Sequence, residues 1–241
     1  MDIEIRANER VDFLGIDDMV ILQNTELYTF TSDAVVLANS VRTTSRDRIL
    51  DIGTGSAIIP LIIAGKHKVA HIDGVEIQEY MADMARRSVE ANGLTDTIDI
   101  INGDIKEYRP SREYDIIVTN PPYFAEGQMR EREEIAMSRH EVSLTLAELI
   151  SCAARMLKFG GKFYMVHKCT RLAEAMTLMS NNGIIPKVVT LVYPKASLAP
   201  DTFIIEGKSH AQHGLTIKRF VMYNEDGTMT DDAYRMYNKE S

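Results

Sequence analysis

Residues 49–56 read Ile-Leu-Asp-Ile-Gly-Thr-Gly-Ser, a short apolar run that ends in a glycine-rich turn. An apolar segment, residues 57–64, follows the turn directly. A run of this length before a glycine turn is typical of a buried strand, and the segment behind it is predicted to be a buried helix. Strand, turn and helix in this order begin an open α/β sheet, in which ligands bind at the carboxyl ends of the strands.

The alternation of strands and helices continues outward from this unit. The hydrophobic pattern predicts strands at residues 71–77, 98–102, 114–120 and 162–167, two or three closing strands among residues 187–193, 203–206 and 216–223, and helices at 78–92, 144–157 and 170–181. We therefore expect an α/β fold with a doubly wound, mainly parallel seven-stranded sheet.

The first 44 residues are predicted to form a short extension packed on this core. After a polar lead, residues 19–23 and 27–30 are expected to pair as a β-hairpin around a turn at Asn24-Thr25. Ser32 is expected to cap the helix that follows, with Asp33 in its first turn, where a carboxylate complements the helix dipole. The predicted domains are residues 1–44 and residues 45–241.

Composition limits the class of protein. The 241 residues, 45% of them hydrophobic, are enough for a substantial core. The first residues lack signal-peptide character and the longest apolar run, 57–65, is too short to span a bilayer, so we expect a cytoplasmic protein without membrane contact. Cys152 and Cys169 are expected to be reduced core thiols. No metal-ligand spacing is visible, and the sequence does not set the oligomeric state.

The net charge of −8 argues at first against a nucleic-acid partner, but the charges are segregated. Residues 153–220 contain ten Lys or Arg and three Asp or Glu, a local excess of seven positive charges. We expect this third of the chain to contact an anionic partner, with Lys195 and Lys208 among the contacts.

The strand at 114–120 ends in Asn120-Pro121-Pro122-Tyr123. Two prolines force the chain out of the sheet, because proline has no N–H for the strand ladder. The Asn120 side-chain oxygen and the Pro121 carbonyl can each accept one N–H of a flat amine, and Tyr123 can stack on the ring that carries it. We therefore predict that this turn is the catalytic ledge for an exocyclic amino group.

Residues 124–143 interrupt the alternation. They contain eight charged side chains and His140, a pattern that predicts a mobile loop or lid beside the ledge. Phe124, Arg139 and His140 are accordingly candidate substrate contacts.

The glycine turn separates two cofactor families. A dinucleotide site would need a third glycine where Ile58 stands, so NAD is disfavoured. The pattern Asp51-x-Gly53-x-Gly55 resembles the cofactor loop of class I S-adenosylmethionine-dependent methyltransferases. That resemblance implies further cofactor contacts after the next two strands. They are Glu76 and Ile77, with Glu76 on the ribose hydroxyls, and Asp104 and Ile105, with Asp104 on the adenine amine.

Over its whole length the sequence also resembles the bacterial tRNA1(Val) (adenine(37)-N6)-methyltransferases. The resemblance is carried by residues 9–12, 14–15, 21–23, 30–38, 51–60, 120–123, 139–141 and 224–227. It implies S-adenosylmethionine as cofactor, tRNA as partner, N6-methylation of the adenine next to the anticodon, and Asp33 among the cofactor-binding residues. The chain departs from the family at Phe13, where Asp is frequent.

Two other methyl acceptors fit the same ledge. A protein glutamine N5-methyltransferase would present a planar carboxamide to it, although such enzymes carry a longer N-terminal helical domain than the residues before the first core strand allow. Methylation of guanine or adenine amino groups in ribosomal RNA is a similar alternative. Cytosine C5 methylation is disfavoured because it needs a nucleophilic thiol, and no cysteine is near the ledge in sequence. A non-catalytic cofactor-binding scaffold would not need Asn120.

Overall fold

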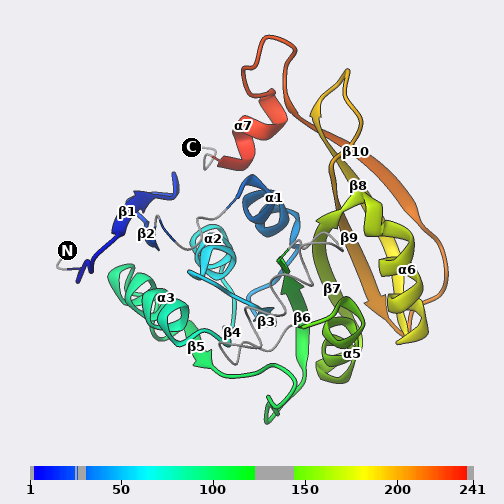
Figure 1. The fold of residues 1–241 in the computed structure, drawn as a ribbon. Coiled ribbons are helices and arrows are strands. Elements are labelled where there is room, and N and C mark those ends of the chain that lie inside the picture. Colours follow the sequence, from blue (N-terminus) through cyan, green and yellow to red (C-terminus); the bar gives the residue numbers. More distant parts are fainter. Residues whose placement is uncertain (1–2, 25, 27–30, 123–143, 238–241) are drawn as a thin grey trace.

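The computed structural model describes residues 3–24, 26, 31–122 and 144–237. Two sequence predictions fall outside these residues: the strand at 27–30 and the lid at 124–143, together with Tyr123 of the ledge. An eight-stranded sheet in the order β10-β8-β9-β7-β6-β3-β4-β5 forms the centre of the molecule (Figure 1). Its strands are β3 Arg48–Ile52, β4 His71–Glu76, β5 Ile98–Asn102, β6 Tyr114–Thr119, β7 Leu157–Lys168, β8 Ile184–Lys195, β9 Thr202–Ser209 and β10 Thr216–Tyr223.

Helices cover both faces of the sheet, as the predicted alternation requires. They are α1 Ser32–Ser40, α2 Ile58–Lys66, α3 Glu79–Ala91, α5 Leu146–Met156, α6 Leu172–Asn181 and α7 Asp231–Tyr237, with a 3-10 turn at Cys169–Arg171. Neighbouring strand residues belong to opposite cores: Ile49 packs with α1, α2 and α3, whereas Leu50 packs with α5. Successive side chains of a strand point to opposite faces of the sheet, so a strand that is buried between two helical layers is apolar on both faces.

The α/β prediction is confirmed, with one more strand than expected. The neighbouring strands β5, β4, β3, β6 and β7 run parallel to one another. Strand β9 is antiparallel to both β7 and β8, and β10 forms the edge of the sheet, parallel to β8. All three predicted closing strands join the sheet, so it has eight strands rather than seven. Strands β7 and β8 are also longer than predicted: β7 begins at Leu157, which pairs with Tyr114 of β6, and β8 begins at Ile184, which pairs with Ser209 of β9.

The N-terminal extension contains a strand pairing that the sequence did not predict, while the predicted partner of residues 19–23, residues 27–30, lies outside the described residues. Strand β2, Val20–Asn24, forms its hairpin with β1, Glu9–Phe13, in the segment expected to be a polar lead. The mixed sequence Glu-Arg-Val-Asp-Phe concealed the strand, because none of its residues is fully buried and it therefore lacks an apolar face. Helix α1 begins after Thr31 instead of Ser32, and its cap makes no side-chain hydrogen bond. The proposed division between residues 44 and 45 stays a prediction, although α1 shares a core with β3.

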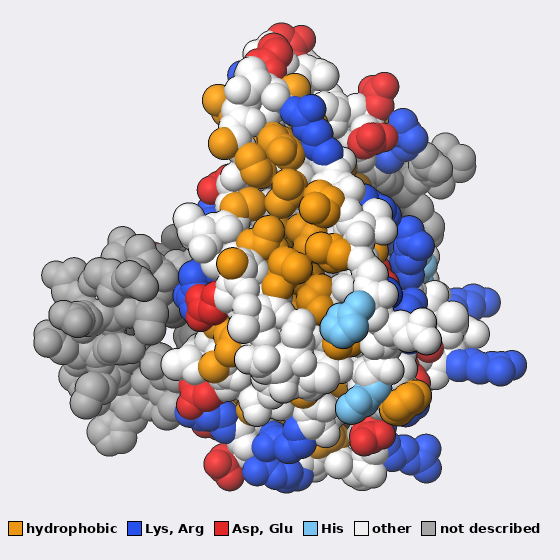
Figure 2. All heavy atoms as spheres, turned by 90° about the vertical axis from the view of Figure 1, so that its right-hand side faces the viewer, with side chains coloured by type: hydrophobic (Ala, Val, Ile, Leu, Met, Phe, Trp, Pro, Cys, Tyr) orange, Lys and Arg blue, Asp and Glu red, His pale blue; other side chains and the backbone are white. Residues whose placement is uncertain are grey.

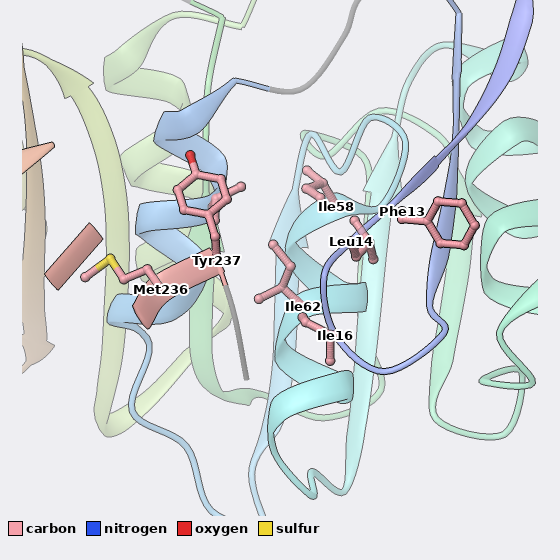
Figure 3. A pocket seen from close by; sticks show the side chains of 8 residues that line it. Phe13, Leu14, Ile16, Ile58, Ile62, Met236 and Tyr237 are labelled. Carbon is pink, nitrogen blue, oxygen red and sulfur yellow. The ribbon is translucent and has the colours of Figure 1, made fainter. Parts of the chain in front are cut away.

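Helix α7 was not anticipated. Thr230 caps it, since its hydroxyl accepts a hydrogen bond from the Ala233 N–H at 3.2 Å. Its last residues, Met236 and Tyr237, lie beside an apolar cavity between α1, α2 and the turn of the N-terminal hairpin (Figure 3). The ammonium group of Lys66 donates to the Met236 carbonyl at 2.6 Å. The C-terminal helix thus packs against the N-terminal hairpin over α2.

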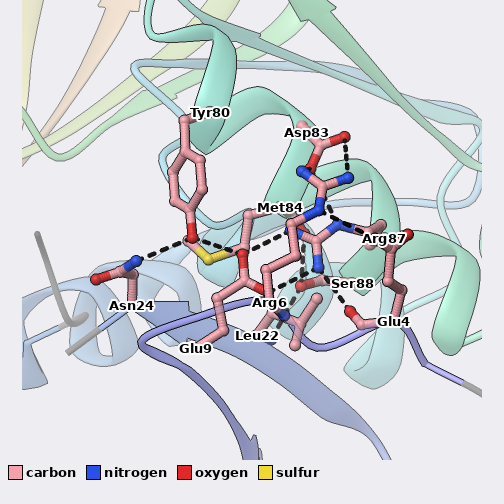
Figure 4. Close-up of polar contacts among 10 residues, drawn as sticks. All are labelled: Glu4, Arg6, Glu9, Leu22, Asn24, Tyr80, Asp83, Met84, Arg87 and Ser88. Carbon is pink, nitrogen blue, oxygen red and sulfur yellow. Dashed lines mark hydrogen bonds and ion pairs between the residues drawn. The ribbon is translucent and has the colours of Figure 1, made fainter. Parts of the chain in front are cut away.

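A buried ion cluster fastens the hairpin to α3 (Figure 4). The Glu9 carboxylate side chain is 0% exposed and accepts two hydrogen bonds from the Arg87 guanidinium, at 2.7 and 2.8 Å. Tyr80 donates its hydroxyl proton to the same carboxylate at 2.6 Å and accepts a bond from Asn24 at 2.9 Å. The hydrogen bonds from Arg87 lower the pKa of Glu9 to about 2.

Replacing Arg87 with methionine should lower the free energy of unfolding by about 3–5 kcal/mol, because Glu9 would remain buried without its cation. Chemical denaturation at pH 7 measures the change. Arg10→Met is the matched control: Arg10 pairs with Asp12 on the same hairpin, but is 54% exposed, so its loss should cost less than about 1 kcal/mol. Equal effects of the two substitutions would contradict the role of the buried pair.

The pKa of Glu9 is lowered in the folded protein, which means that its ionised carboxylate stabilises the fold. Because its folded pKa of about 2 lies below the ordinary value of 4.5, its contribution is complete above pH 4.5 and is lost as pH falls toward 2. The difference in free energy of unfolding between the wild-type protein and Arg87→Met should therefore become smaller as the pH falls from 4.5 toward 2.

Candidate active site at the carboxyl edge of the sheet

Four parallel strands bring the predicted site residues to one edge. Ile52 at the end of β3 pairs with Val75 of β4 on one side and with Thr119 of β6 on the other. Glu76 pairs in turn with Asn102 of β5. The predicted residues that follow these strand ends therefore lie side by side: Gly53, Gly55, Glu76, Ile77, Asp104, Ile105, Asn120 and Pro121. Their roles toward a ligand stay predictions.

The glycine turn after β3 needs residues without a side chain in the left-handed region. Gly53 and Gly55 have φ angles of 72° and 56°, and Ala57 follows at 68° before α2 begins. The Gly53 and Thr54 N–H groups donate to the Val75 carbonyl at 2.9 and 3.1 Å, which holds the turn over β4. A Cβ added to Gly53 would meet no atom within 4 Å, so the backbone there borders open space.

Asp51 is buried beneath this turn and is 0% exposed. One carboxylate oxygen, Oδ2, accepts the Thr54 hydroxyl at 2.7 Å. The other, Oδ1, is the buried side-chain oxygen without a hydrogen-bond partner among the described residues. Burial raises the pKa of Asp51 to about 7, opposed by the Thr54 bond and increased by the Glu76 carboxylate. A buried acceptor of this kind fits a cationic ligand group that would favour its charged form.

Gly74 makes room for this arrangement. It pairs with Asp51 across the sheet, and a Cβ there would come within 2.9 Å of the Thr54 hydroxyl oxygen. Thr54 and Gly74 were not singled out from the sequence. The hydroxyl of Thr54 inside the glycine turn could have been recognised from the sequence as a partner for Asp51. The need for glycine at position 74 could not, because it depends on the pairing of β4 with β3.

Glu76 ends β4 and is 6% exposed. Its two carboxylate oxygens accept the N–H groups of Gly55 and Gln78, each at 2.9 Å. Burial raises its pKa, and these backbone bonds oppose the rise. Glu76 thus ties the glycine turn to the start of α3, a role additional to the predicted contact with a ribose, and each oxygen keeps lone pairs for further donors.

The residues after β5 form the third part of the edge. The half-buried Asp104 accepts the Lys106 N–H at 2.8 Å, and Ile105 is buried against α5. Ile77 is 45% exposed, an apolar side chain beside Glu76. Asn102, which the sequence reading missed, donates to the carbonyls of Glu76 and Ile77 at 2.9 and 3.1 Å and so fixes this corner.

The ledge begins where β6 ends. The Thr119 hydroxyl donates to the Ile52 carbonyl at 2.9 Å, which holds the ends of β6 and β3 together. Asn120 and Pro121 are half-buried and Pro122 is exposed, so the chain does leave the sheet at the prolines. Tyr123, Phe124, Arg139 and His140 lie outside the described residues.

Asp33, the remaining predicted cofactor ligand, lies farther along the edge. Its carboxylate accepts the Thr202 hydroxyl of β9 at 3.3 Å. β9 is separated from β6 by β7, so Asp33 is on the opposite side of the ledge from Glu76 and Asp104.

The structure separates the two lysines predicted to act together. Lys195 ends β8 at the carboxyl edge, while Lys208 pairs through its strand with Lys162 and Ile185, toward the opposite edge. Lys208 is level with Ile185, so the two lysines are separated along the strands by on the order of 30 Å. Lys168 shares the edge of Lys195, whereas Lys158 and Lys162 lie near Lys208. Clustering in sequence concealed this, because antiparallel strands carry neighbouring residues to opposite ends.

Cys169 lies closer to the ledge than its sequence position suggested. It follows β7, the strand paired with β6, at the same edge. Both thiols are free, and burial raises the pKa of each, so they are protonated at neutral pH. Among the described residues, no three His, Cys, Asp or Glu side chains gather as a metal site, and no helix is long and apolar enough to cross a membrane.

Comparison with known families shows which family the chain belongs to. The family model of the methyltransferase small domain matches residues 31–182, more than half of the chain. The chain belongs to this family. The matched span runs from α1 through α6 and contains the glycine turn, Glu76, Asp104 and Asn120.

Two relatives extend the similarity of this methyltransferase beyond that span. A tRNA1(Val) (adenine(37)-N6)-methyltransferase of Pedobacter heparinus is 30% identical over 213 residues, 87% of this chain and 88% of the relative. The enzyme of that name from Dyadobacter fermentans is 28% identical, over 85% and 86% of the two chains. The chain therefore also belongs to the family that carries this name.

Solved structures agree on the fold. A predicted O-methyltransferase from Agrobacterium tumefaciens has a TM-score of 0.69 at 19% identity, over 85% of this chain and 95% of that one. Geranyl diphosphate C-methyltransferase from Streptomyces coelicolor, solved with S-adenosyl-L-homocysteine, has a TM-score of 0.56 at 12% identity, over 73% and 79%. The methyltransferase thus has the class I, Rossmann-like fold.

Replacing Asp51 with asparagine should change how stability depends on pH. The folded pKa of about 7 lies above the ordinary 3.8, so the stabilising contribution is complete below pH 3.8 and is lost as pH rises to 7. We expect the wild-type protein to lose on the order of 2–4 kcal/mol between pH 4 and pH 8 by this route, and Asp51→Asn to be spared.

Urea denaturation of both proteins across this pH range measures the effect. Asp99→Asn, an exposed carboxylate on β5, is the control and should keep the wild-type dependence. If Asp51→Asn showed the same dependence of stability on pH as the wild-type protein, that dependence would not come from the Asp51 carboxyl group.

Proposed function

We propose that the protein transfers the methyl group of S-adenosylmethionine to the exocyclic N6 of an adenine in tRNA, by family the adenine 37 of tRNA1(Val). One observation supports this most: the glycine turn, Glu76 and Asn120-Pro121 lie at adjacent strand ends in a chain of this family. A tRNA substrate implies a cytoplasmic location.

The residues at the edge fit the cofactor. The left-handed turn at Gly53 and Gly55 lets a ligand approach the backbone. Asp51 Oδ1, which has no hydrogen-bond partner in the described part of the chain, suits the methionine ammonium group. Glu76 would accept the ribose hydroxyls, Asp104 the adenine amine, while Ile77 and Ile105 would border the ring. When bound, S-adenosylmethionine supplies a methyl group on a positively charged sulfur.

The ledge would prepare the acceptor. The lone pair of an adenine N6 is delocalised into the ring, so the amine is a weak nucleophile. The Asn120 oxygen and the Pro121 carbonyl would each accept one N–H, which orients the nitrogen and favours its pyramidal form, and Tyr123 would hold the ring. The excess proton would leave to water or through the Asn120 oxygen. The base must be unstacked to reach this ledge.

Alternative acceptors are less well supported. A protein glutamine N5-methyltransferase or a ribosomal RNA amino-methyltransferase would use the same ledge, but the relatives matched over most of the chain carry a tRNA adenine name. Cytosine C5 chemistry is disfavoured for a new reason: Cys169 lies at the right edge, yet burial holds it as the thiol rather than the nucleophilic thiolate.

Methyl transfer to an unmodified tRNA1(Val) transcript tests the proposal. Mass spectrometry of the digested product should show N6-methyladenosine. Asn120→Ala should lower the single-turnover rate by roughly a hundredfold or more with little change in cofactor affinity, since the lost oxygen aligns the amine in the transition state. Asn181→Ala, exposed on α6, is the control. A wild-type rate for Asn120→Ala would exclude its proposed role, and label in a release factor but not in tRNA would favour the glutamine alternative.

The positions of the lysines give a second test. Lys195→Ala should reduce the slope of log affinity against log salt by about 0.7–0.9, the value of one phosphate contact. Lys208→Ala, with the same loss of charge at the opposite edge, should leave the slope unchanged. Filter binding of the transcript over a salt series measures both. Equal slopes for the two variants would mean that the carboxyl edge does not set the tRNA surface.

A further inference from the structure

The sheet extends beyond its helical cover on the side of α6. Strands β8 and β10 form this extension, and α6 packs on β8. On β10, Phe220 and Met222 share a core with α1 and α7. The intervening residues Ile217, Arg219 and Val221 therefore point to the opposite face, beside Leu191 and Tyr193 of β8. We call these five residues the β8–β10 face.

The β8–β10 face is apolar at its centre and cationic at its border. Ile217 is 66% exposed, and Arg219 is exposed next to it. A view onto this side of the molecule shows a continuous hydrophobic area, with Lys and Arg and also some Asp and Glu side chains around it (Figure 2). Such an area on the described surface indicates a binding partner rather than a solvated sheet.

Charge decides what kind of partner fits. Strands β8 and β10 together carry Lys187, Lys195, Lys218 and Arg219 and contain no Asp or Glu. A second copy that added to the β10 edge would bring the Lys218 and Arg219 cations of two β10 strands into one ladder, and like charges across paired strands are destabilising. Lysine on an edge strand opposes such pairing. The complementary partner is anionic.

The Arg219 side chain is arranged for a flat, anionic ligand. Its guanidinium carbon lies 4.5 Å from the centre of the Tyr193 ring, and it donates to the Ala196 carbonyl at 2.7 Å. A guanidinium held against a ring keeps a stacking surface and free N–H donors, the groups that bind unpaired bases and phosphates. RNA-binding sheets combine stacking side chains with positive charge in this way.

We propose that the β8–β10 face binds RNA, as a second contact of the tRNA substrate outside the nucleotide that is methylated. This inference rests on the proposed function for the identity of the RNA. Lys195 at the end of β8 connects the face with the carboxyl edge of the sheet. Arg219 and Tyr193 contact bases and phosphates, and the apolar side chains around them pack on riboses.

Adjacent residues of β10 provide the test. Arg219→Ala removes a cation from the β8–β10 face, and Lys218→Ala removes one from the opposite face, because consecutive strand residues point to opposite sides of the sheet. Lys218 lines a groove with Val36 and Tyr164 on that opposite side, and Arg219 at the sheet edge also borders this groove. With an unmodified tRNA transcript as probe, Arg219→Ala should raise the Kd about tenfold and reduce the salt slope by about 0.7–0.9. Tyr193→Ala should raise the Kd about five- to 150-fold, the range of one stacked base. Lys218→Ala should match the wild-type protein.

The outcomes separate this inference from the proposed function. Methyl transfer with equal Kd values for Arg219→Ala, Tyr193→Ala and Lys218→Ala would overturn the RNA face and leave the function standing. Transcript binding that depends on Arg219 and Tyr193 without any methylation would support the face and refute the function. A concentration-dependent dimer that Ile217→Glu dissociates, with transcript affinity unchanged, would show that the face binds a second copy and would overturn the proposal. Affinity for S-adenosylmethionine should be unchanged in all four variants, which confirms that the folded core is intact.

Discussion

The parallel pairing of β3 with β4 and β6 is the constraint on which the site depends. It brings the ends of β4, β3 and β6, which are tens of residues apart in the sequence, to adjacent positions at one edge of the sheet. A shift of one residue in either pairing would turn Asp51 and Glu76 toward the wrong face. The register is fixed because both faces of these strands are buried, Ile49 in one core and Leu50 in the other.

This pairing also explains how two carboxylates can be buried close together. Burial raises the pKa of both Asp51 and Glu76, so the folded chain bears an electrostatic cost at this edge. Thr54 and the N–H groups of Gly55 and Gln78 offset part of it. The remaining cost stays in a site that a cationic cofactor would relieve, which is where proteins commonly retain perturbed carboxylates.

Both ends of the chain are attached to helices of the same core. The N-terminal hairpin is attached to α3 through Glu9 and Arg87, and α3 begins directly after Glu76. The C-terminal helix α7 is held to α2 through Lys66. Because α2 follows the glycine turn and α3 follows the end of β4, both attachments restrict the helices next to the candidate site. The sheet extension at β8 and β10 has a different character: α6 covers part of β8, while Ile217 and Arg219 of β10 are exposed among the described residues.

The sequence by itself determined the α/β class, the order of the core elements and the residues at the strand ends. These follow from local signals: the apolar runs, the left-handed glycines 53 and 55, and prolines 121 and 122, which end a strand wherever it lies. The tertiary structure alone decided which distant segments meet. Residues 9–13 pair with 20–24, Gly74 makes room for Thr54, Asn102 braces residues 76 and 77, and Lys195 and Lys208 lie at opposite edges. These outcomes depend on strand register and direction, which are set by the packing of whole faces and are not encoded in any short stretch of residues.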